Sequence, residues 1–272
     1  MQPQHFRYDE DAHGVGTIRL DRPEKLNALT FASYAELRDF FVHLRTRESA
    51  RAVIVTGTGR AFCSGGDVQD IIGALFDVPE SELYAFTRMT CDLIENIRLL
   101  EKPVVAALNG VTCGAGAVIA AACDVRIATD TAKIAFLFTK VGLSGADMGA
   151  AWLLPRLVGL GHATELLMLG DFTSPERAYE IGLYNRVVRE HALMTEAGRW
   201  ARKLADGPAY GLAITKRMLN AEASLSLREA MQAEGWIQAE CMRHPDYREA
   251  FEAKTAKREP DFRASGARRG GA

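Results

Sequence analysis

The chain has 272 residues, of which 48% are hydrophobic and 25% charged, and its formal net charge is −2 at pH 7. Such a composition is typical of a soluble globular protein with one large core, or with a core and a small satellite. The small net charge argues against a nucleic-acid or membrane partner. The first residues, "MQPQHFRYDEDAHG", lack the apolar stretch of a signal peptide.

Strand and helix patterns alternate along the first half of the chain. Residues 14–20 and 51–57 are β-branched runs that end in turn residues, so both are predicted to be strands. Between them, residues 30–46 carry apolar side chains at helical spacing, with Thr30 as the N-cap. A second amphipathic helix is predicted over 81–100.

The longest apolar run, residues 104–125, has the length of a membrane span, but Asn109 and several glycines interrupt it. A buried strand, a tight turn and a buried helix explain it better. Residues 102–108 and 123–129 are therefore predicted strands. The alternation of strands and helices predicts βαβ crossovers and a mainly parallel sheet.

After Gly149 the strand pattern almost vanishes. Residues 173–182 form a short predicted helix with Ser174 as its cap, Pro175 in its first turn and Gly182 as its stop. Three further helices with apolar stripes are predicted over 192–207, 208–220 and 225–242. The chain is thus expected to consist of an α/β core (1–200) and a helical C-terminal part (201–272) that packs on the core or on a neighbouring subunit.

Several well-known catalytic motifs are absent. The segments "TGTGRAF" and "CGAGA" do not complete G-x-G-x-x-G, and "FCSGG" lacks the first glycine of G-x-S-x-G. The six histidines, His162 among them, show no metal-binding spacing, so no metal site is expected. Five scattered cysteines without C-x-x-C spacing favour reduced thiols in a cytoplasmic protein.

The two glycine turns are able to present backbone N–H groups to a ligand. Each follows a predicted strand, and its small residues let a ligand oxygen approach the main chain. If the strands are neighbours, two donors point at one place, and a helix that begins near Gly116 adds its dipole. This geometry stabilises an oxyanion. Two tight turns that only serve helix packing explain the same spacing equally well.

The sequence closely resembles the crotonase family, which comprises the enoyl-CoA hydratases and isomerases. The matching segments are "IRLDRPEKLNALT", "VIVTGTGRAFCSGGDV", "KPVVAALNGVTCGAG", "ACDVRIAT", "LPRLVGLGHATELLMLGDFTSPERAYEIGLYNRVV" and the "KREPDFR" tail. The resemblance implies an α/β, crotonase-like spiral of ββα units, whose helical C-terminal part packs against neighbours in a trimer or dimer of trimers. It also implies an acyl-CoA thioester substrate and no separate cofactor, because coenzyme A belongs to the substrate.

The resemblance also assigns roles to individual positions. The backbone N–H groups of Ser64 and Ala115 are expected to form the oxyanion hole. Coenzyme A is expected to contact Lys25, Leu26, Ala28, Ala61, Gly66 and Val68. A flexible cation such as Lys25 suits the phosphates of coenzyme A.

The chain departs from the family pattern at its catalytic acids. Typical hydratases carry one glutamate three residues after the second oxyanion donor and another in the following segment. These positions hold Val118 and Phe138 here, so hydration by two glutamates cannot be inherited. The remaining acid is Asp147, which aligns with an aspartate of the dienoyl-CoA isomerases and with the nucleophile of the aryl-CoA dehalogenases.

Asp147 is the predicted principal acid/base. A carboxyl group in an apolar cleft has a raised pKa, which suits proton transfer near neutrality. A plain N-cap of the following helix is the alternative. The expected acyl pocket is lined by Val118, Phe136, Phe138 and Trp152, which favours a bulky, cyclic or aromatic acyl group.

The sequence therefore predicts an acyl-CoA enzyme. Isomerisation is easier to explain than hydration, because a single carboxylate is enough to remove and return a proton. Hydration or hydrolysis with Asp147 as base or nucleophile is an alternative. A second alternative is a non-catalytic protein that binds CoA thioesters as a scaffold.

Overall fold

The computed structural model describes residues 2–267, and its core is built on a six-stranded sheet in the order β1-β2-β3-β5-β7-β9. The first pair of strands is antiparallel and the other neighbours are parallel, as the alternating sequence pattern predicts. The strands are β1 (Phe6–Glu10), β2 (Val15–Leu20), β3 (Ala52–Gly57), β5 (Val104–Leu108), β7 (Val125–Thr129) and β9 (Arg186–Val188).

A second, small parallel sheet consists of β4 (Ala61–Cys63), β6 (Val111–Cys113) and β8 (Ile134–Ala135). Two glycine-containing turns leave this sheet, "SGG" after β4 and "GAG" after β6, and they lie side by side because β4 and β6 pair directly. The glycine turn "TGTG" follows β3 of the main sheet instead, so the adjacent turns are "FCSGG" and "CGAGA".

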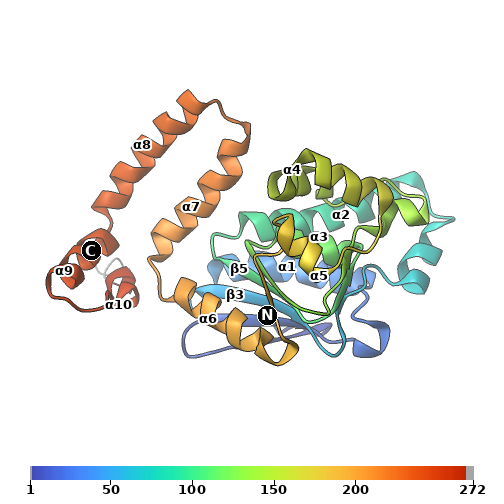
Figure 1. The fold of residues 1–272 in the computed structure, drawn as a ribbon, viewed down its shortest axis with the longest axis horizontal. Coiled ribbons are helices and arrows are strands. Elements are labelled where there is room, and N and C mark those ends of the chain that lie inside the picture. Colours follow the sequence, from blue (N-terminus) through green and yellow to red (C-terminus); the bar gives the residue numbers. More distant parts are fainter. Residues whose placement is uncertain (1, 268–272) are drawn as a thin grey trace.

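Helices cover both faces of the main sheet (Figure 1). The larger apolar cluster joins one face to α1, α2, α3 and α4, and the smaller cluster joins the other face to α6. The helices of the core are α1 (Phe31–Thr46), α2 (Glu80–Leu99), α3 (Ala115–Ala122), α4 (Ala150–Leu169), α5 (Pro175–Glu180) and α6 (Leu193–Ala205).

The predicted helix starts are confirmed. The Thr30 side chain accepts the amide of Ser33, whose own side chain accepts the Thr30 amide, which completes a capping box at α1. Ser174 accepts the amide of Arg177 at the start of α5, and Pro175 occupies the first turn. The long apolar run folds as β5, β6 and α3.

The C-terminal arm (residues 209–267) contains α7 (Ala209–Ala221), α8 (Leu227–Arg243), α9 (Pro245–Thr255) and α10 (Phe262–Ala267). Within this arm, the helices α8 and α9 lie farthest from the sheet (Figure 1). The preceding helix α6 packs on the sheet through Ala197, Ala201 and Ala205. Helix α7 stays attached to the core, since its buried Lys216 contacts Asp124 at 2.8 Å. Among the described residues, no helix is long and apolar enough to cross a membrane.

Candidate active site

The turn after β4 offers one free backbone donor, but not at the predicted position. Sequence comparison points to Ser64, whose amide instead donates to the Leu26 carbonyl at 3.0 Å. The prediction that Ser64 supplies an oxyanion donor is therefore wrong for this structure. The physical reason is that the turn pairs with the preceding loop and thereby uses the Ser64 amide.

Gly66 provides the free donor. In a short parallel bridge, Leu29 donates to the Gly65 carbonyl at 2.8 Å and accepts the Asp67 amide at 2.9 Å. Hydrogen bonding alternates along an extended chain, so the intervening Gly66 directs its own N–H to the opposite side. Within the described part of the chain, this amide donates to no protein acceptor.

The second donor lies at the start of α3. Gly114 joins β6 to the helix with φ of 54° and ψ of −127°, a conformation that glycine adopts without steric cost. Ala115 is the first helical residue, and such a residue has no acceptor for its N–H within the helix. The predicted donor Ala115 is therefore available.

The two turns touch each other. A Cβ atom added to Gly65 would lie 3.4 Å from the Ala115 nitrogen, and one added to Gly116 would lie 2.4 Å from the Cys63 carbonyl oxygen. Only glycine at position 116 lets α3 approach β4 this closely. The free N–H groups of Gly66 and Ala115 thus belong to two turns held in van der Waals contact.

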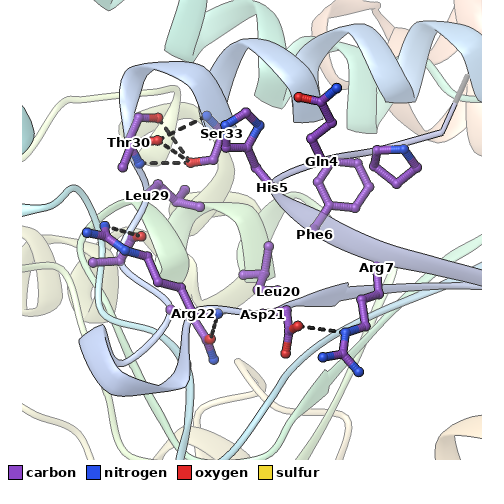
Figure 2. Close-up of a pocket in the computed structure, with 13 residues that line it drawn as sticks. Gln4, His5, Phe6, Arg7, Leu20, Asp21, Arg22, Leu29, Thr30 and Ser33 are labelled. Carbon is purple, nitrogen blue, oxygen red and sulfur yellow. Dashed lines mark hydrogen bonds and ion pairs between the residues drawn. The ribbon is translucent and has the colours of Figure 1, made fainter.

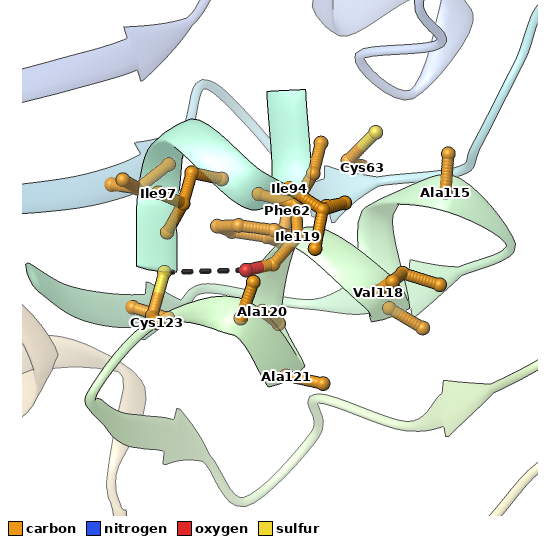
Figure 3. Packing of buried hydrophobic residues seen from close by; sticks show 14 of the residues in the cluster. Phe62, Cys63, Ile94, Ile97, Ala115, Val118, Ile119, Ala120, Ala121 and Cys123 are labelled. Carbon is orange, nitrogen blue, oxygen red and sulfur yellow. Dashed lines mark hydrogen bonds between the residues drawn. The ribbon is translucent and has the colours of Figure 1, made fainter. Parts of the chain in front are cut away.

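The helix behind the turns carries no ionisable side chain. All eight residues of α3 are buried, and Val118 has no exposed surface. Figure 3 shows this helix among Ile94 and Ile97 of α2 and Phe62 of β4. The catalytic charge of the site therefore has to come from another element.

Asp147 supplies an acid from the segment before α4. Its Oδ1 accepts the amide of the next residue, Met148, at 2.8 Å. The alternative role as an N-cap is not realised, because Gly149 occupies the cap position and α4 has no side-chain cap. Met148 has a left-handed backbone with φ of 49°, a strained conformation that is common at functional sites.

Burial raises the pKa of Asp147, as predicted, and the Met148 amide partly opposes this shift. No other carboxylate among the described residues contributes to it. Burial is the largest cause of the raised pKa of Tyr34 on α1, followed by Cys63 and then by the charge of Asp147. Burial is also the largest cause of the raised pKa of Cys91 on α2, and the charge of Asp147 comes next. Asp147 therefore lies close to both helices, in a mostly apolar environment.

Three of the four residues expected to line an acyl pocket belong to the same apolar cluster, and the fourth, Trp152, does not. Val118 and Phe136 are fully buried and Phe138 is 7% exposed, so all three belong to the packed interior. Trp152 is 42% exposed, and the Arg156 guanidinium lies over its ring at 4.1 Å. Their contact with an acyl group stays a prediction.

The loop expected to hold coenzyme A is fixed by a residue that sequence reasoning missed. Asn27 is 1% exposed, and its Nδ2 donates to the carbonyls of Thr58, Ala61 and Phe62 at 2.8–3.2 Å. Its Oδ1 accepts the Arg22 amide at 2.9 Å. This single side chain ties the loop to β4, and its place inside "RPEKLNAL" was the available signal.

Ion pairs brace the same loop. Arg22 contacts the carboxylates of Asp67 at 2.8 Å and Asp70 at 3.2 Å. The amides of Asp70 and Gln69 donate to Asp67 and, with Arg22, hold the pKa of its carboxyl group below the usual value. The predicted coenzyme A residues surround this region: Lys25 and Val68 are exposed, Leu26, Ala28 and Gly66 half-buried, and Ala61 buried.

A pocket of about 580 Å³ lies on the other side of this loop (Figure 2). Of the residues predicted to bind coenzyme A, only Ala28 lines it. Its two arginines are already paired, Arg7 with Asp21 at 2.6 Å and Arg22 with Asp67. The pocket therefore presents no unpaired guanidinium to a phosphate.

The described residues contain no cluster of histidine, cysteine and carboxylate side chains able to hold a metal ion. All five cysteines are free thiols. His162 lies on α4, half-exposed, beside Glu165 at 3.5 Å.

Comparison with known proteins decides the family. The family model described as enoyl-CoA hydratase/isomerase matches residues 10–265. The chain belongs to the enoyl-CoA hydratase/isomerase family. It is therefore an acyl-CoA enzyme, and its fold is the expected crotonase fold of two sheets with a helical C-terminal region.

Individual relatives differ in the reactions that their names give. The chain is 36% identical to a 1,2-epoxyphenylacetyl-CoA isomerase from Escherichia coli, over 92% of this chain and 95% of that one. It is 30% identical to a 4-chlorobenzoyl coenzyme A dehalogenase from Arthrobacter, over 88% and 87%. A crystal structure from Streptomyces coelicolor, named as an enoyl-CoA hydratase, is 49% identical with a TM-score of 0.92 and covers 95% of this chain and 94% of that one.

Proposed function

We propose that this enzyme isomerises an acyl-CoA thioester by proton transfer through Asp147. The free amides of Gly66 and Ala115 bind the thioester oxygen. The Asp147 carboxylate removes an acidic proton near the carbonyl, which leaves an enolate whose oxyanion the two N–H groups stabilise. When the acyl group has a double bond between carbons 3 and 4, the enolate is extended, and the protonated Asp147 returns the proton to carbon 4 as the double bond shifts to carbons 2 and 3, so the product has the same composition as the substrate.

The observation that carries this proposal is a half-buried carboxyl group, Asp147, that lies close to Tyr34, which in turn borders the Gly66 turn. The pKa of Asp147 is raised by burial alone, and no second acid perturbs it. Positions 118 and 138, where two-acid hydratases carry glutamates, hold buried Val and Phe side chains. A proton shuttle needs one group that both accepts and donates, and a raised pKa suits both roles.

The named relatives agree with one-carboxylate chemistry and leave a second candidate. One relative bears the name of an isomerase, and another that of an aryl-CoA dehalogenase. In the second candidate function, Asp147 attacks an activated aryl carbon and water hydrolyses the resulting ester. This reaction incorporates solvent oxygen into the product, whereas isomerisation does not.

We also propose that coenzyme A binds along the loop held by Asn27, with Lys25 close to its phosphates. The exposed position of Lys25 and the rigid attachment of the loop to β4 support this placement. Contacts from Leu26, Ala28, Ala61 and Val68 complete the proposed site. Coenzyme A enters as part of the substrate, and the proton transfer requires no other cofactor.

The enzyme is further proposed to form a trimer or a dimer of trimers through its C-terminal arm. None of the residues of helix α8 is buried within this chain. Its apolar side chains Leu227, Met231 and Trp236 are 78%, 62% and 74% exposed. Such a large exposed apolar surface is typical of a protein interface.

The proposed reaction is tested by mass spectrometry of a panel of enoyl-, dienoyl- and aryl-CoA thioesters in water labelled with deuterium and heavy oxygen. The panel is incubated with the wild type, with Asp147→Asn and with Asp171→Asn. Asp171 is an exposed acid after α4, so its variant controls for loss of a carboxylate as such. We expect the wild type and Asp171→Asn to incorporate deuterium without oxygen, and Asp147→Asn to lose this activity.

Other outcomes select other chemistries. Incorporation of heavy oxygen indicates hydration or hydrolysis and refutes isomerisation. Binding of thioesters with no change in any of them favours a scaffold. Deuterium uptake that survives in Asp147→Asn removes Asp147 from the mechanism.

A further inference from the structure

Tyr34 is a largely buried residue whose hydroxyl group has no hydrogen-bond partner among the described residues, although the oxygen itself is not among their fully buried polar atoms. Tyr34 lies in the first turns of α1, and only 3% of the residue is exposed. A buried tyrosine hydroxyl normally finds a partner, as that of Tyr184 does by donating to the Ala132 carbonyl at 2.8 Å. An unpaired hydroxyl in this position is therefore an observation that requires an explanation.

The hydroxyl lies at the candidate active site. A Cβ atom added to Gly66 would stand 3.6 Å from the Tyr34 oxygen, so the phenol borders the turn that offers the first free amide. Tyr34 is also close enough to Asp147 for the carboxylate charge to raise the pKa of the phenol, after burial and Cys63. Tyr34 thus lies near both the oxyanion turn and the proposed acid/base.

The surroundings of the hydroxyl are otherwise apolar. Ile71 packs beside Gly66, and Phe86 of α2 makes an edge-to-face contact with the Tyr34 ring at 5.8 Å between centroids. Burial holds the pKa of Tyr34 well above its ordinary value, so the hydroxyl stays protonated and donates a hydrogen bond. An apolar wall with one donor discriminates between ligands that differ by one acceptor.

We propose that Tyr34 is a specificity-determining residue whose hydroxyl donates a hydrogen bond to an oxygen atom on the acyl group, close to the thioester. The preferred substrates are then acyl-CoA thioesters with an oxygen substituent on carbon 2 or 3. This inference rests on the proposed function, because it takes the Gly66 amide to hold the thioester oxygen. A hydrocarbon acyl group leaves the hydroxyl unpaired and binds less well.

The test compares two probes that differ by one oxygen atom, 3-hydroxybutyryl-CoA and butyryl-CoA. Exchange of the proton on carbon 2 is measured in deuterated water, and the dissociation constant of each probe is measured by calorimetry. We expect the wild type to prefer the hydroxylated probe by about tenfold or more in kcat/KM, in Kd or in both. Tyr34→Phe is expected to remove this preference.

The control is Tyr184→Phe, which deletes a buried hydroxyl far from the oxyanion turns in the chain and is expected to keep the preference. The preference is the ratio of the values for the two probes on the same variant. A general loss of stability affects both values equally and therefore leaves this ratio unchanged. Tyr34→Phe removes no hydrogen bond seen in the structure, and an unchanged melting temperature verifies that it folds.

Two results overturn the inference. An equal effect of Tyr34→Phe on both probes indicates that the hydroxyl positions Asp147, and a preserved preference indicates that it contacts no acyl oxygen. If Asp147→Asn abolishes exchange while Tyr34→Phe leaves the ratio intact, the inference fails and the proposed reaction stands. If the wild type exchanges neither probe, the proposed reaction fails for these probes. The ratio of the two dissociation constants then still tests whether Tyr34 binds an acyl oxygen.

Discussion

Replacement of Gly116 by alanine tests whether the spacing of the two glycine turns sets the reaction rate. The new Cβ atom would lie 2.4 Å from the Cys63 carbonyl oxygen, whereas ordinary van der Waals contacts begin at 3.4 Å. The start of α3 must therefore move away from β4 by about 1 Å. This movement carries the Ala115 amide away from the Gly66 amide, so the two N–H groups can no longer both donate to the same oxyanion.

The expected loss in kcat/KM is on the order of 10²-fold, the typical effect of a 1 Å misplacement or of a missing oxyanion donor. Overpacking is also expected to destabilise the fold by about 1–3 kcal/mol, which lowers Tm by several degrees. The assay is deuterium exchange into a thioester that the wild type processes, together with a thermal melt. Gly161→Ala on α4 is the control, because its Cβ atom meets nothing within 4 Å.

An activity of Gly116→Ala within about threefold of the wild type, with the melt lowered as expected, would refute the reasoning. It would show that the close approach of α3 to β4 serves packing alone.

Three further changes probe other parts of the molecule. Because burial raises the pKa of Asp147, the base is lost as pH falls through this raised value, so kcat/KM of the wild type should fall on the acid side, while Asp147→Asn should stay inactive at every pH. The neutral carboxyl group favours the folded state at low pH, and this contribution is lost as pH rises through the raised pKa, so Asp147→Asn should melt higher than the wild type near neutrality. Asn27→Ala removes three donated hydrogen bonds and leaves the Arg22 amide without its acceptor, which should lower the free energy of unfolding by about 2–4 kcal/mol in denaturant titration and weaken CoA binding. Trp236→Glu places a charge on the exposed face of α8, and sedimentation should show smaller assemblies; an unchanged sedimentation coefficient would place the interface elsewhere.

The local parts of the fold were predictable because their signals are short in sequence. The capping box of Thr30 and Ser33 lies within four residues, and the buried strands are continuous apolar runs. Strands β1 and β9 were missed, because β1 alternates charged with other side chains and β9 has only three residues. Helix α9, with the sequence "PDYREAFEAKT", shows little apolar periodicity and was also missed.

The candidate site was predictable only in part, because its details depend on contacts between distant segments. Which amide of residues 64–67 is free is decided by pairing with Leu26 and Leu29, about 40 positions earlier in the chain. Sequence comparison therefore found the correct turn and the wrong donor. Tyr34 belongs to no motif, and its role depends on packing beside Gly66.

Asp147 was found for a different reason. It is the acid that remains in its segment once Val118 and Phe138 replace the expected glutamates, and a missing charge is visible in sequence. The structure adds its burial, its raised pKa and the finding that it does not cap α4.

The loss of the two glutamates also changes the electrostatics of the proposed reaction. Every carboxylate near the thioester oxygen opposes the negative charge that develops there, and the effect is strong in a buried site. The eight residues of α3 are buried and uncharged, so this helix presents N–H groups and its dipole, and no carboxylate, to the developing oxyanion. The Asp67 carboxylate that follows Gly66 is paired with Arg22. Asp147 becomes neutral when it takes the proton, so it adds no negative charge beside the enolate. A site of this kind favours reactions that remove and return one proton, and it lacks the additional base that activates water.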